Sequence, residues 1–374
     1  MSCLDKLKGD TFMKITVKEI KVICSNPTNP ANGYFAWPSV ARLQDGRLAM
    51  VASGFRYRHV CPFGKVVMCV SDDEGTSWSR PTIIMDTPLD DRDAGILPFG
   101  EKSLLVTSFN NSKETQRAFN RGYWETAERK DGNNPYVSGY LDVLDSEWAE
   151  AAYLGSTFII SHDGGKTFGD VLRCPVTSPH GPTLTPDGDI LYVGRFFGAP
   201  RSPDRHLAAF RLTPDGQSEM LGEIPDIPGL ESHEPHAIVL EDGRILVHIR
   251  VQGQGLFTVY QSESSDGGRS FSAPRPLLAD QGGSPPHLLK LCDGTLISTY
   301  GYRQPPYGIK VMVSRDGGHT WDTDHDLYIN GVHRDLGYPA SVELTGGDIL
   351  TVFYAKERVD GPAVIMQAVW GLER

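Results

Sequence analysis

The sequence contains no long hydrophobic run. None of its apolar stretches approaches the roughly 18 residues that a membrane-spanning helix needs, and the N-terminal residues lack the apolar segment of a secretory signal. We therefore expect a cytoplasmic protein without membrane contact, in which residues 1–13 form a leader or a disordered tail.

Basic runs and paired cysteines are also missing. The chain has 36 Lys and Arg against 47 Asp and Glu, a net charge of -11. Because nucleic-acid binding needs clustered basic side chains, this composition argues against a nucleic-acid partner. The six cysteines have no CxxC spacing, so we expect neither a zinc site nor a disulfide framework, and most of the thiols should be reduced and buried.

What the sequence does contain is a repeat of the form Ser-x-Asp-x-Gly-x-Ser/Thr-Trp/Phe. It begins at Ser71, Ser161, Ser264 and Ser314, and a degenerate copy begins at Thr213. We expect the Asp to accept hydrogen bonds within its own turn, the Gly to supply a positive φ, and the aromatic side chain to pack into a sheet.

A second repeat is a tight turn between two alternating apolar segments. The six turns are Asp45-Gly46, Gly100-Glu101, Asp187-Gly188, Asp242-Gly243, Asp293-Gly294 and Gly346-Gly347. Turns of this kind predict hairpins, and six hairpins about fifty residues apart predict six four-stranded blades around a channel.

The expected fold class is therefore all-β: a single six-bladed β-propeller over residues 14–374. Neither Lys14–Cys24 nor Ala363–Gly371 contains such a turn. We expect one of these segments to complete the blade of the other and so close the ring.

The spacing is broken once, since the turns at Gly100 and Asp187 lie 87 residues apart. This gap predicts an insertion between blades 2 and 3, at about 110–152, with two helix-like pieces, Lys113–Lys130 and Ser146–Ala152. The insertion is either a surface loop, a flap over the channel mouth or a subunit contact, which leaves a homo-oligomer as an open alternative.

Charged residues lie at matching distances from the turns. Glu234 is eight residues before Asp242 and Arg250 is eight residues after it, so the hairpin brings the two side chains to one end. Tyr338 lies eight residues before Gly346 in the last hairpin.

These features resemble the sialidase (neuraminidase) superfamily, and the resemblance covers nearly the whole chain. Glu234 and Arg250 match the segment that holds the family's glutamate and the second arginine of its carboxylate-binding triad, and Tyr338 matches its catalytic tyrosine. The resemblance implies an exo-acting glycoside hydrolase with a tyrosine nucleophile. We expect no cofactor and no metal.

Two positions depart from the family pattern. Ala36 stands where the first arginine of the triad is expected, and Lys65 stands at the place of the acid/base aspartate. The chain is therefore similar to a divergent sialidase relative, and the resemblance does not fix the sugar as sialic acid.

Superposing the hairpins about their turns predicts which side chains share the channel mouth. The strands that lead into the turns contribute Trp37, Asp93, His180, Glu234, His236, His287 and Tyr338, and those that leave the turns contribute Arg56, Asn110, Arg195, Arg250, Arg303 and Tyr354.

Roles for these residues follow from their chemistry. A phenol with a pKa of about 10 is a poor nucleophile until a carboxylate takes its proton, so Tyr338 and Glu234 should act together. Arg195, Arg250 and Arg303 would form a cationic pocket for an acidic sugar. Arg56 is the expected replacement for the missing first arginine, with Arg58 and Arg92 as alternatives.

Asp93 is the expected general acid, with its pKa raised by the neighbouring Asp90 and Asp91. His180, His236 and His287 are rival acids, and together with Trp37 they are expected to contact the substrate. A metal site at the three histidines is not favoured, because the strand starts of a propeller are expected to lie far apart around the channel.

The expected function is release of a terminal acidic sugar, sialic, nonulosonic or uronic, from a glycan. Two alternatives remain open. One is a polysaccharide lyase that acts on uronate-containing glycans, with tyrosine and histidine as base and acid. The other is a non-catalytic carbohydrate-binding propeller.

Overall fold

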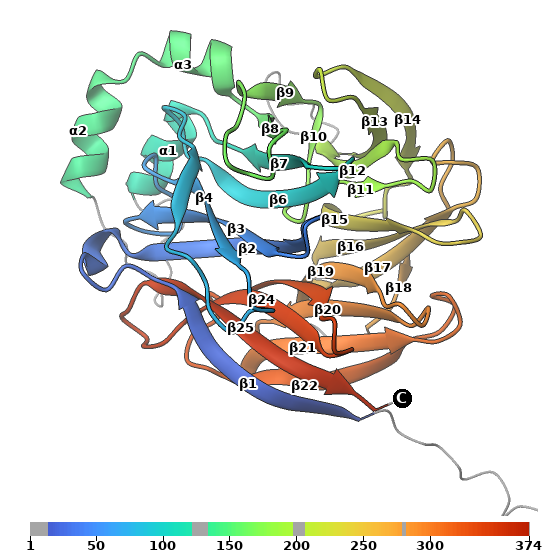
Figure 1. Cartoon of the computed structure of the whole chain (residues 1–374). Coiled ribbons are helices and arrows are strands. Elements are labelled where there is room, and N and C mark those ends of the chain that lie inside the picture. The colour runs from blue at the N-terminus through green and yellow to red at the C-terminus, as the bar shows by residue number, and fades with distance from the viewer. Residues whose placement is uncertain (1–13, 122–133, 197–205, 279–281, 374) are drawn as a thin grey trace, which may run out of the picture.

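The computed structural model describes residues 14–121, 134–196, 206–278 and 282–373, and its strands form six antiparallel sheets (Figure 1). Blade 1 contains the 3-10 helix η1 (Pro30–Asn32) and then β2 (Tyr34–Arg42), β3 (Leu48–Arg56), β4 (Lys65–Ser71) and β5 (Thr82–Met85). Blade 2 contains β6 (Arg92–Phe99), β7 (Ser103–Phe109), β8 (Ser156–Ser161) and β9 (Leu172–Cys174).

The inner strand of blade 3 is interrupted. This blade contains β10 (Val176–Thr177), β11 (Thr183–Leu184), β12 (Ile190–Phe196), β13 (Leu207–Leu212) and β14 (Ser218–Ile224), and both β10 and β11 pair with β12. Blade 4 contains β15 (Glu231–Val239), β16 (Ile245–Gly253), β17 (Leu256–Ser264) and β18 (Arg275–Pro276).

The last sheet is built from both ends of the chain. Blade 5 contains β19 (Gly283–Lys290), β20 (Leu296–Tyr302), β21 (Tyr307–Ser314) and β22 (Asp322–Gly331). Blade 6 contains β23 (Gly337–Glu343), β24 (Ile349–Lys356), β25 (Ala363–Leu372) and β1 (Ile15–Cys24), with β1 antiparallel to β25. The predicted six-bladed fold and its closure by the two end segments are confirmed.

The core consists of apolar clusters between neighbouring blades, and the boxes contribute to them. In the first box Asp73 accepts hydrogen bonds from the Ser77 amide and hydroxyl at 2.8 and 2.7 Å, as predicted for a self-contained turn. The indole of Trp78 then donates to Gln367 of blade 6 at 2.8 Å. The indole of Trp321 in blade 5 likewise donates to Gln261 of blade 4, so these box tryptophans link one blade to the blade before it in the ring.

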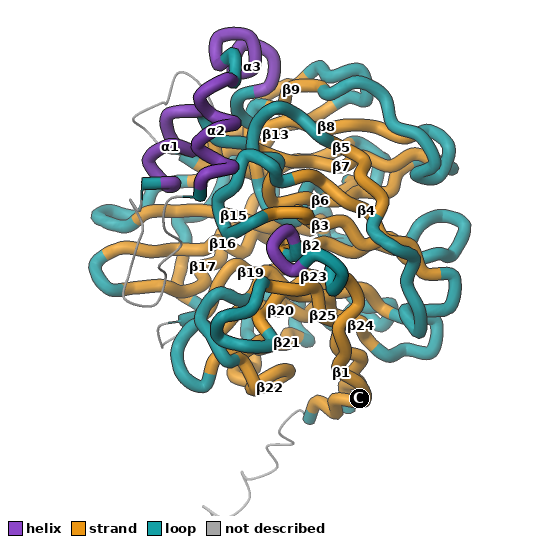
Figure 2. The backbone as a smooth tube through the Cα atoms, turned by 90° about the vertical axis from the view of Figure 1, so that its left-hand side faces the viewer, coloured by secondary structure: helices purple, strands orange, loops and turns teal. Residues whose placement is uncertain are grey.

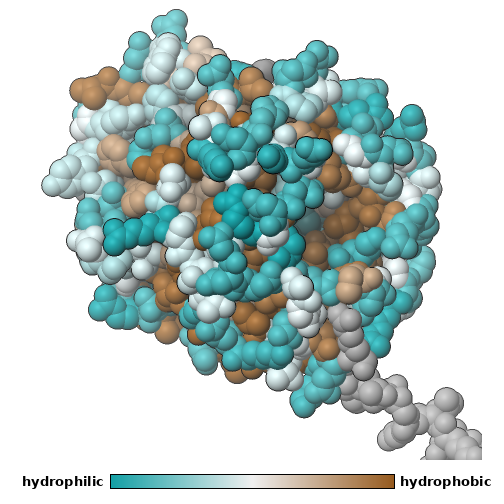
Figure 3. Space-filling view, viewed as in Figure 1, coloured by the Kyte–Doolittle hydropathy of each residue, from teal (hydrophilic) through white to brown (hydrophobic). Residues whose placement is uncertain are grey.

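Four of the cysteines are buried free thiols, as predicted: Cys24, Cys61, Cys69 and Cys174. Cys292 is exposed. Among the described residues no helix is long and apolar enough to cross a membrane. The face shown in Figure 3 is mostly hydrophilic, with apolar side chains gathered in a hollow on its right-hand side.

The insertion lies at the predicted residues, about 110–152, but its predicted place between blades 2 and 3 was wrong. Its helices α1 (Lys113–Asn120), α2 (Pro135–Val143) and α3 (Ser146–Tyr153) lie between β7 and β8, inside blade 2. The spacing of the turns could not distinguish these places, because both lengthen the same interval. The predicted helix Lys113–Lys130 ends at Asn120, and its remainder from 122 lies outside the described residues; α3 was predicted and α2 was not.

Figure 2 looks onto the side of the ring where η1 leads into β2, and the three helices lie at one edge of the ring. Val137 and Leu141 of α2 pack against Cys61 in the loop after β3. The described helices therefore support a loop of blade 1.

Candidate active site

The inner strands of four blades carry the same backbone irregularity near their starts. Each of these strands has a shift in pairing register, at 36–39, 92–95, 233–236 and 337–340. The residue with left-handed backbone is Trp37 (φ 55°), Asp93 (φ 47°), Glu234 (φ 42°) or Tyr338 (φ 50°). Left-handed backbone costs a non-glycine residue roughly 1–2 kcal/mol, and such strain gathers at functional sites. Since a bulge re-aims a side chain, the four blades present these residues at the same end of the channel.

Tyr338 and Glu234 are in direct contact although 104 positions separate them in the chain. The Tyr338 hydroxyl donates a hydrogen bond to Glu234 Oε1 at 2.6 Å. Arg250 Nη1 lies 2.6 Å from Glu234 Oε2 and 3.4 Å from the Tyr338 hydroxyl. The carboxylate is therefore shared between a phenol and a guanidinium, which is the arrangement that a carboxylate-assisted tyrosine nucleophile requires.

The surroundings fix the protonation of this pair. Burial raises the pKa of Glu234, but the charge of Arg250 and the hydrogen bonds from Tyr338 and Arg250 outweigh it, so the pKa lies below its ordinary value. Burial, followed by the negative charges of Glu234 and Asp93, raises the pKa of Tyr338 well above its ordinary value. At neutral pH the resting pair is a neutral phenol and an ionised carboxylate.

Asp93 is buried next to this pair, with 3% of its surface exposed and Oδ1 without a hydrogen-bond partner. Burial raises its pKa to about 7; the charge of Arg92 opposes this, and that of Glu234 adds to it. The predicted cause was wrong in part, because burial and Glu234 contribute more than Asp90. Asp91 instead accepts hydrogen bonds from the Thr87 amide and hydroxyl, at 2.7 and 2.8 Å.

Two of the predicted arginines flank Tyr338. Arg303 lies 5.6 Å from the centre of the Tyr338 ring, and Arg250 and Arg303 both lie over the ring of Phe257. Arg250 Nε is buried without a hydrogen-bond partner. Arg195 is farther along the mouth, where it contacts His233 beside Glu234. Arg250 and Arg303 together place two positive charges next to Tyr338.

Trp37 takes the bulge position in blade 1, and Ala36 does not face the mouth. Ala36 is fully buried in the core between blades 1 and 6. The Trp37 ring is covered by Arg92, whose guanidinium carbon lies 4.0 Å from the ring centre, and it lies 6.4 Å from the ring of Tyr338. The indole Nε1 is buried and has no hydrogen-bond partner. Trp37 is 1% exposed and lies beneath a guanidinium, so the predicted contact of Trp37 with the substrate was wrong.

The placement of Arg56 contradicts a substrate-binding role. Its side chain is fully buried, it pairs with Asp90 at 2.5 Å, and it donates to Ser53 and to the backbone carbonyl of His59 at 2.7 and 2.9 Å. Gln116 of α1 also donates to Asp90, at 3.1 Å. The distance of Arg56 from the turn correctly predicted its position in the strand. It did not reveal that an ion pair with Asp90 would keep the side chain buried.

The three predicted histidines meet in the channel, below the mouth. The ring centres of His236 and His287 are 4.4 Å apart, and His180 lies 5.6 and 5.0 Å from them. The expectation that these strand starts lie far apart was therefore wrong, because inner strands converge on the axis. Burial lowers the pKa of all three imidazoles, which keeps them neutral. Among the described residues no group of histidine, cysteine or carboxylate side chains has the arrangement of a metal site.

Sequence reasoning missed a group of hydrogen-bonded side chains around Asp335, which includes Tyr354, a neighbour of Tyr338. Asp335 is buried and accepts from the hydroxyls of Tyr34 and Tyr354 at 3.0 and 3.2 Å, and His59 Nδ1 lies 3.1 Å from it. Arg303 donates to the Tyr354 hydroxyl at 3.4 Å. Tyr354 was predicted at the mouth from its distance to the turn, whereas Asp335, in a loop, gave no periodic signal.

Comparisons with known proteins agree with this architecture. A family profile described as a BNR repeat-like domain matches residues 140–351. A protein of unknown function from Dyadobacter fermentans DSM 18053 has 21% identity and a TM-score of 0.74, over 96% of this chain and 99% of that one. No curated protein sequence matches the chain.

Two enzymes of known activity are similar in fold. The NanB sialidase of Streptococcus pneumoniae has 14% identity and a TM-score of 0.63, over 94% of this chain and 70% of its own. The alpha-L-arabinanase of Penicillium chrysogenum has 14% identity and a TM-score of 0.62, over 95% and 98%. Identities this low show a shared propeller fold. The family profile, which spans more than half of the sequence, shows that the chain belongs to the BNR repeat-like domain family.

Proposed function

We propose that the protein is an exo-acting glycoside hydrolase that releases a terminal acidic sugar through a covalent tyrosyl intermediate. The observation that carries the proposal is the contact of Tyr338 and Arg250 with the two oxygens of Glu234, at 2.6 Å each. Tyr338 is 5% exposed and Asp93 3% exposed, so the reacting groups are largely withdrawn from water. The glycoside hydrolase-like fold of the similar structures is consistent with this chemistry.

In the first step the Tyr338 oxygen attacks the anomeric carbon, and the phenolic proton passes to Glu234 along their hydrogen bond. The bond from the anomeric carbon to the leaving oxygen breaks, and Asp93 donates the proton that this oxygen takes up. With a pKa raised to about 7 by burial, Asp93 keeps a proton at neutral pH that an ordinary aspartate has lost.

In the second step water attacks the same carbon from the face that the leaving group vacated. Ionised Asp93 accepts a proton from this water, the bond to the Tyr338 oxygen breaks, and Glu234 returns its proton to the phenolate. Two inversions give net retention of configuration. A neutral nucleophile suits a sugar with a carboxylate near its anomeric carbon, because an anionic nucleophile would be repelled.

The acidic character of the sugar is inferred from Arg250 and Arg303. Their guanidinium groups flank Tyr338, and arginine pairs with carboxylates through parallel hydrogen bonds. Trp37 and Arg92 take the side where the family resemblance implies a third guanidinium. We therefore propose two charged contacts to the carboxylate, from Arg250 and Arg303, and no direct contact of the sugar with Trp37, which is 1% exposed.

A lyase receives less support from the positions of the histidines. His236 and His287 accept backbone N–H hydrogen bonds through Nδ1, at 3.0 and 3.3 Å. They lie farther into the channel than the bulges, since His236 follows the bulge residue Glu234 by two positions. A lyase would form an unsaturated uronate that absorbs in the ultraviolet, whereas a hydrolase would not. A binding propeller would bind sugars without turnover.

The test is release of 4-methylumbelliferone from its glycosides of sialic, other nonulosonic and glucuronic acids, with an arabinofuranoside as a neutral comparison. We expect turnover of at least one acidic glycoside. Tyr338→Phe and Glu234→Gln should lower kcat at least a hundredfold, while Tyr260→Phe and Glu241→Gln serve as matched controls that leave it unchanged.

Covalent chemistry is checked by mass spectrometry. A fluorinated acidic glycosyl fluoride, whose second step is slow, should add one glycosyl mass to the wild-type protein and none to Tyr338→Phe. Intact substrates throughout, or turnover that survives both active-site changes, would refute the proposed function.

A further inference from the structure

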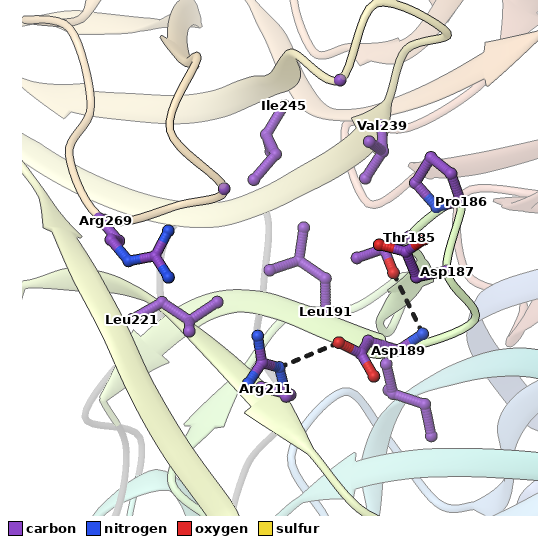
Figure 4. A pocket seen from close by; sticks show the side chains of 13 residues that line it. Thr185, Pro186, Asp187, Asp189, Leu191, Arg211, Leu221, Val239, Ile245 and Arg269 are labelled. Atoms are coloured by element: carbon purple, nitrogen blue, oxygen red, sulfur yellow. Dashed lines mark hydrogen bonds and ion pairs between the residues drawn. The ribbon is translucent and has the colours of Figure 1, made fainter.

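A cavity of about 260 Å³ lies between blades 3 and 4, at the opposite end of the strands from Tyr338 (Figure 4). It is bordered by the turn before β12, which includes Asp187 and Asp189, and by Gly243 in the turn between β15 and β16. Because Glu234 is near the start of β15 and the turn follows its end, the cavity is separate from the candidate active site.

Arginines fill the corresponding place at two other junctions between blades. Arg47 and Arg244 both directly follow an Asp-Gly turn, and their Nε groups donate to the Asp of that turn at 2.9 and 2.8 Å. Their Nη2 groups then reach the box of the next blade, where they donate to the carbonyls of Gly164 and Gly317 at 3.2 and 3.0 Å. An arginine in this position ties one blade to the next and occupies the space between them.

At the junction of blades 3 and 4 this arginine is absent. Asp189 follows the Asp187-Gly188 turn and is directed into an ion pair with Arg211 of its own blade, at 3.1 Å. Gly267, which corresponds to Gly164 and Gly317 in the box of the next blade, lines the cavity. Within the part of the chain that the structure describes, no arginine of blade 3 donates to the carbonyl of Gly267, as Arg47 and Arg244 do at the other two junctions. The residue after the turn is arginine in two of the six hairpins, and the cavity lies at a junction whose sequence lacks this arginine.

The lining combines an apolar floor with one available cation. Leu191, Leu221, Val239 and Ile245 supply the apolar part. Arg211 is neutralised by Asp189 and by Glu219, the latter at 2.9 Å.

The second arginine, Arg269, has a different environment. Its side chain donates to the backbone carbonyl of Asp266 at 3.0 Å, and within the described residues it has no carboxylate partner. Figure 4 shows Arg269 across the cavity from Asp187, so an anion bound at Arg269 would be kept away from that carboxylate.

We propose that this cavity binds a small aliphatic carboxylate. Arg269 would hold the anionic end through two parallel hydrogen bonds, and the alkyl part would pack on Leu191, Leu221 and Ile245, where it is removed from water. Within the described residues, no carboxylate of the protein pairs with Arg269, and no alkyl side chain fills the space over the apolar lining. The site is a second ligand position that does not depend on the proposed hydrolysis.

The probe is 4-methylpentanoate, titrated into the full-length protein and followed by saturation-transfer NMR, with 4-methylpentanamide as the uncharged comparison. We expect saturable binding of the carboxylate and roughly tenfold weaker binding of the amide, since a charged hydrogen-bonding pair is lost. Arg269→Gln should remove this preference, and Lys166→Gln, at the same position of the box in blade 2, should retain it.

A second variant tests the cavity itself. Asp189→Arg introduces the residue found at the two filled junctions, and we expect it to abolish binding of both probes without lowering the Tm. Tyr338→Phe should bind the carboxylate as the wild type does. The proposal fails if wild-type protein shows no saturable binding, or if Arg269→Gln and Asp189→Arg bind 4-methylpentanoate like the wild type.

Discussion

Replacing Asp93 with asparagine should change how the stability of the protein depends on pH. Burial raises the pKa of Asp93 from an ordinary 3.8 to about 7. The folded state therefore keeps a proton that the unfolded state loses between about pH 4 and pH 7. It follows that the free energy of unfolding falls as pH rises through this window and stays at the lower value above pH 7.

The magnitude follows from the two pKa values. A difference of about three pH units, at about 1.4 kcal/mol per unit, corresponds to about 4 kcal/mol over the whole window. Between pH 5 and pH 8 about 2.5 kcal/mol of this remains, because the unfolded state is already mostly ionised at pH 5. Asparagine does not titrate, so Asp93→Asn should lack this part of the pH dependence.

The assay is urea unfolding, followed by tryptophan fluorescence, at four pH values from 5 to 8. Burial also raises the pKa of Asp91 to about 7, but Asp91 is present in both proteins and cancels in the difference between their curves. The exposed Asp360→Asn serves as control. If Asp93→Asn and the wild type give parallel curves, Asp93 is not a carboxylic acid held neutral by its site, and the proposed acid is wrong.

Further predictions concern activity and packing. The kcat/KM of the wild type should fall about tenfold per pH unit above pH 7, because only protonated Asp93 can donate to the leaving group; a flat profile to pH 9 would contradict this role. Arg303→Ala should raise KM for acidic glycosides at least tenfold with kcat within threefold in steady-state assays, as expected for lost binding of the carboxylate; an unchanged KM would exclude that contact. Gly64→Ala should lower the free energy of unfolding by about 3 kcal/mol in urea, because the new methyl group would lie 2.6 Å from the buried Asp90 carboxylate and press on the Arg56 guanidinium. Gly346→Ala, with open space around it, should leave the free energy of unfolding unchanged. Gln116→Ala removes a hydrogen bond to the same buried carboxylate and should cost about 1–2 kcal/mol in the same assay; no change would mean that α1 does not support blade 1.

The repeating parts of the structure could be predicted because local rules decide them. A turn such as Asp242-Gly243 sets where two strands reverse, so counting eight residues in each direction was sufficient to bring Glu234 and Arg250 together. The box turns are equally local, since Asp73 is satisfied within its own loop. Tyr338 could be assigned because its hairpin obeys the same count.

The parts that could not be predicted depend on departures from that count. Trp37, Glu234 and Tyr338 are each followed by proline, which removes a backbone donor from the ladder and marks the bulge that turns the preceding side chain towards the mouth. This signal was available in the sequence but is visible only when the blades are compared. The burial of Arg56 depends on Asp90, a carboxylate in the loop between β5 and β6, and no periodicity encodes that pairing.

The pairing of β1 with β25 has a consequence for how the molecule is made. β1 leaves the ribosome before the other described strands, yet its partner strand begins only at Ala363, so the edge that it will cover does not exist until the other five blades have been made. During that interval strand edges are open to other nascent chains. Tyr338 belongs to the same late sheet, and truncated chains that accumulate during expression would therefore lack the Tyr338 partner of Glu234 even where their first five blades have folded.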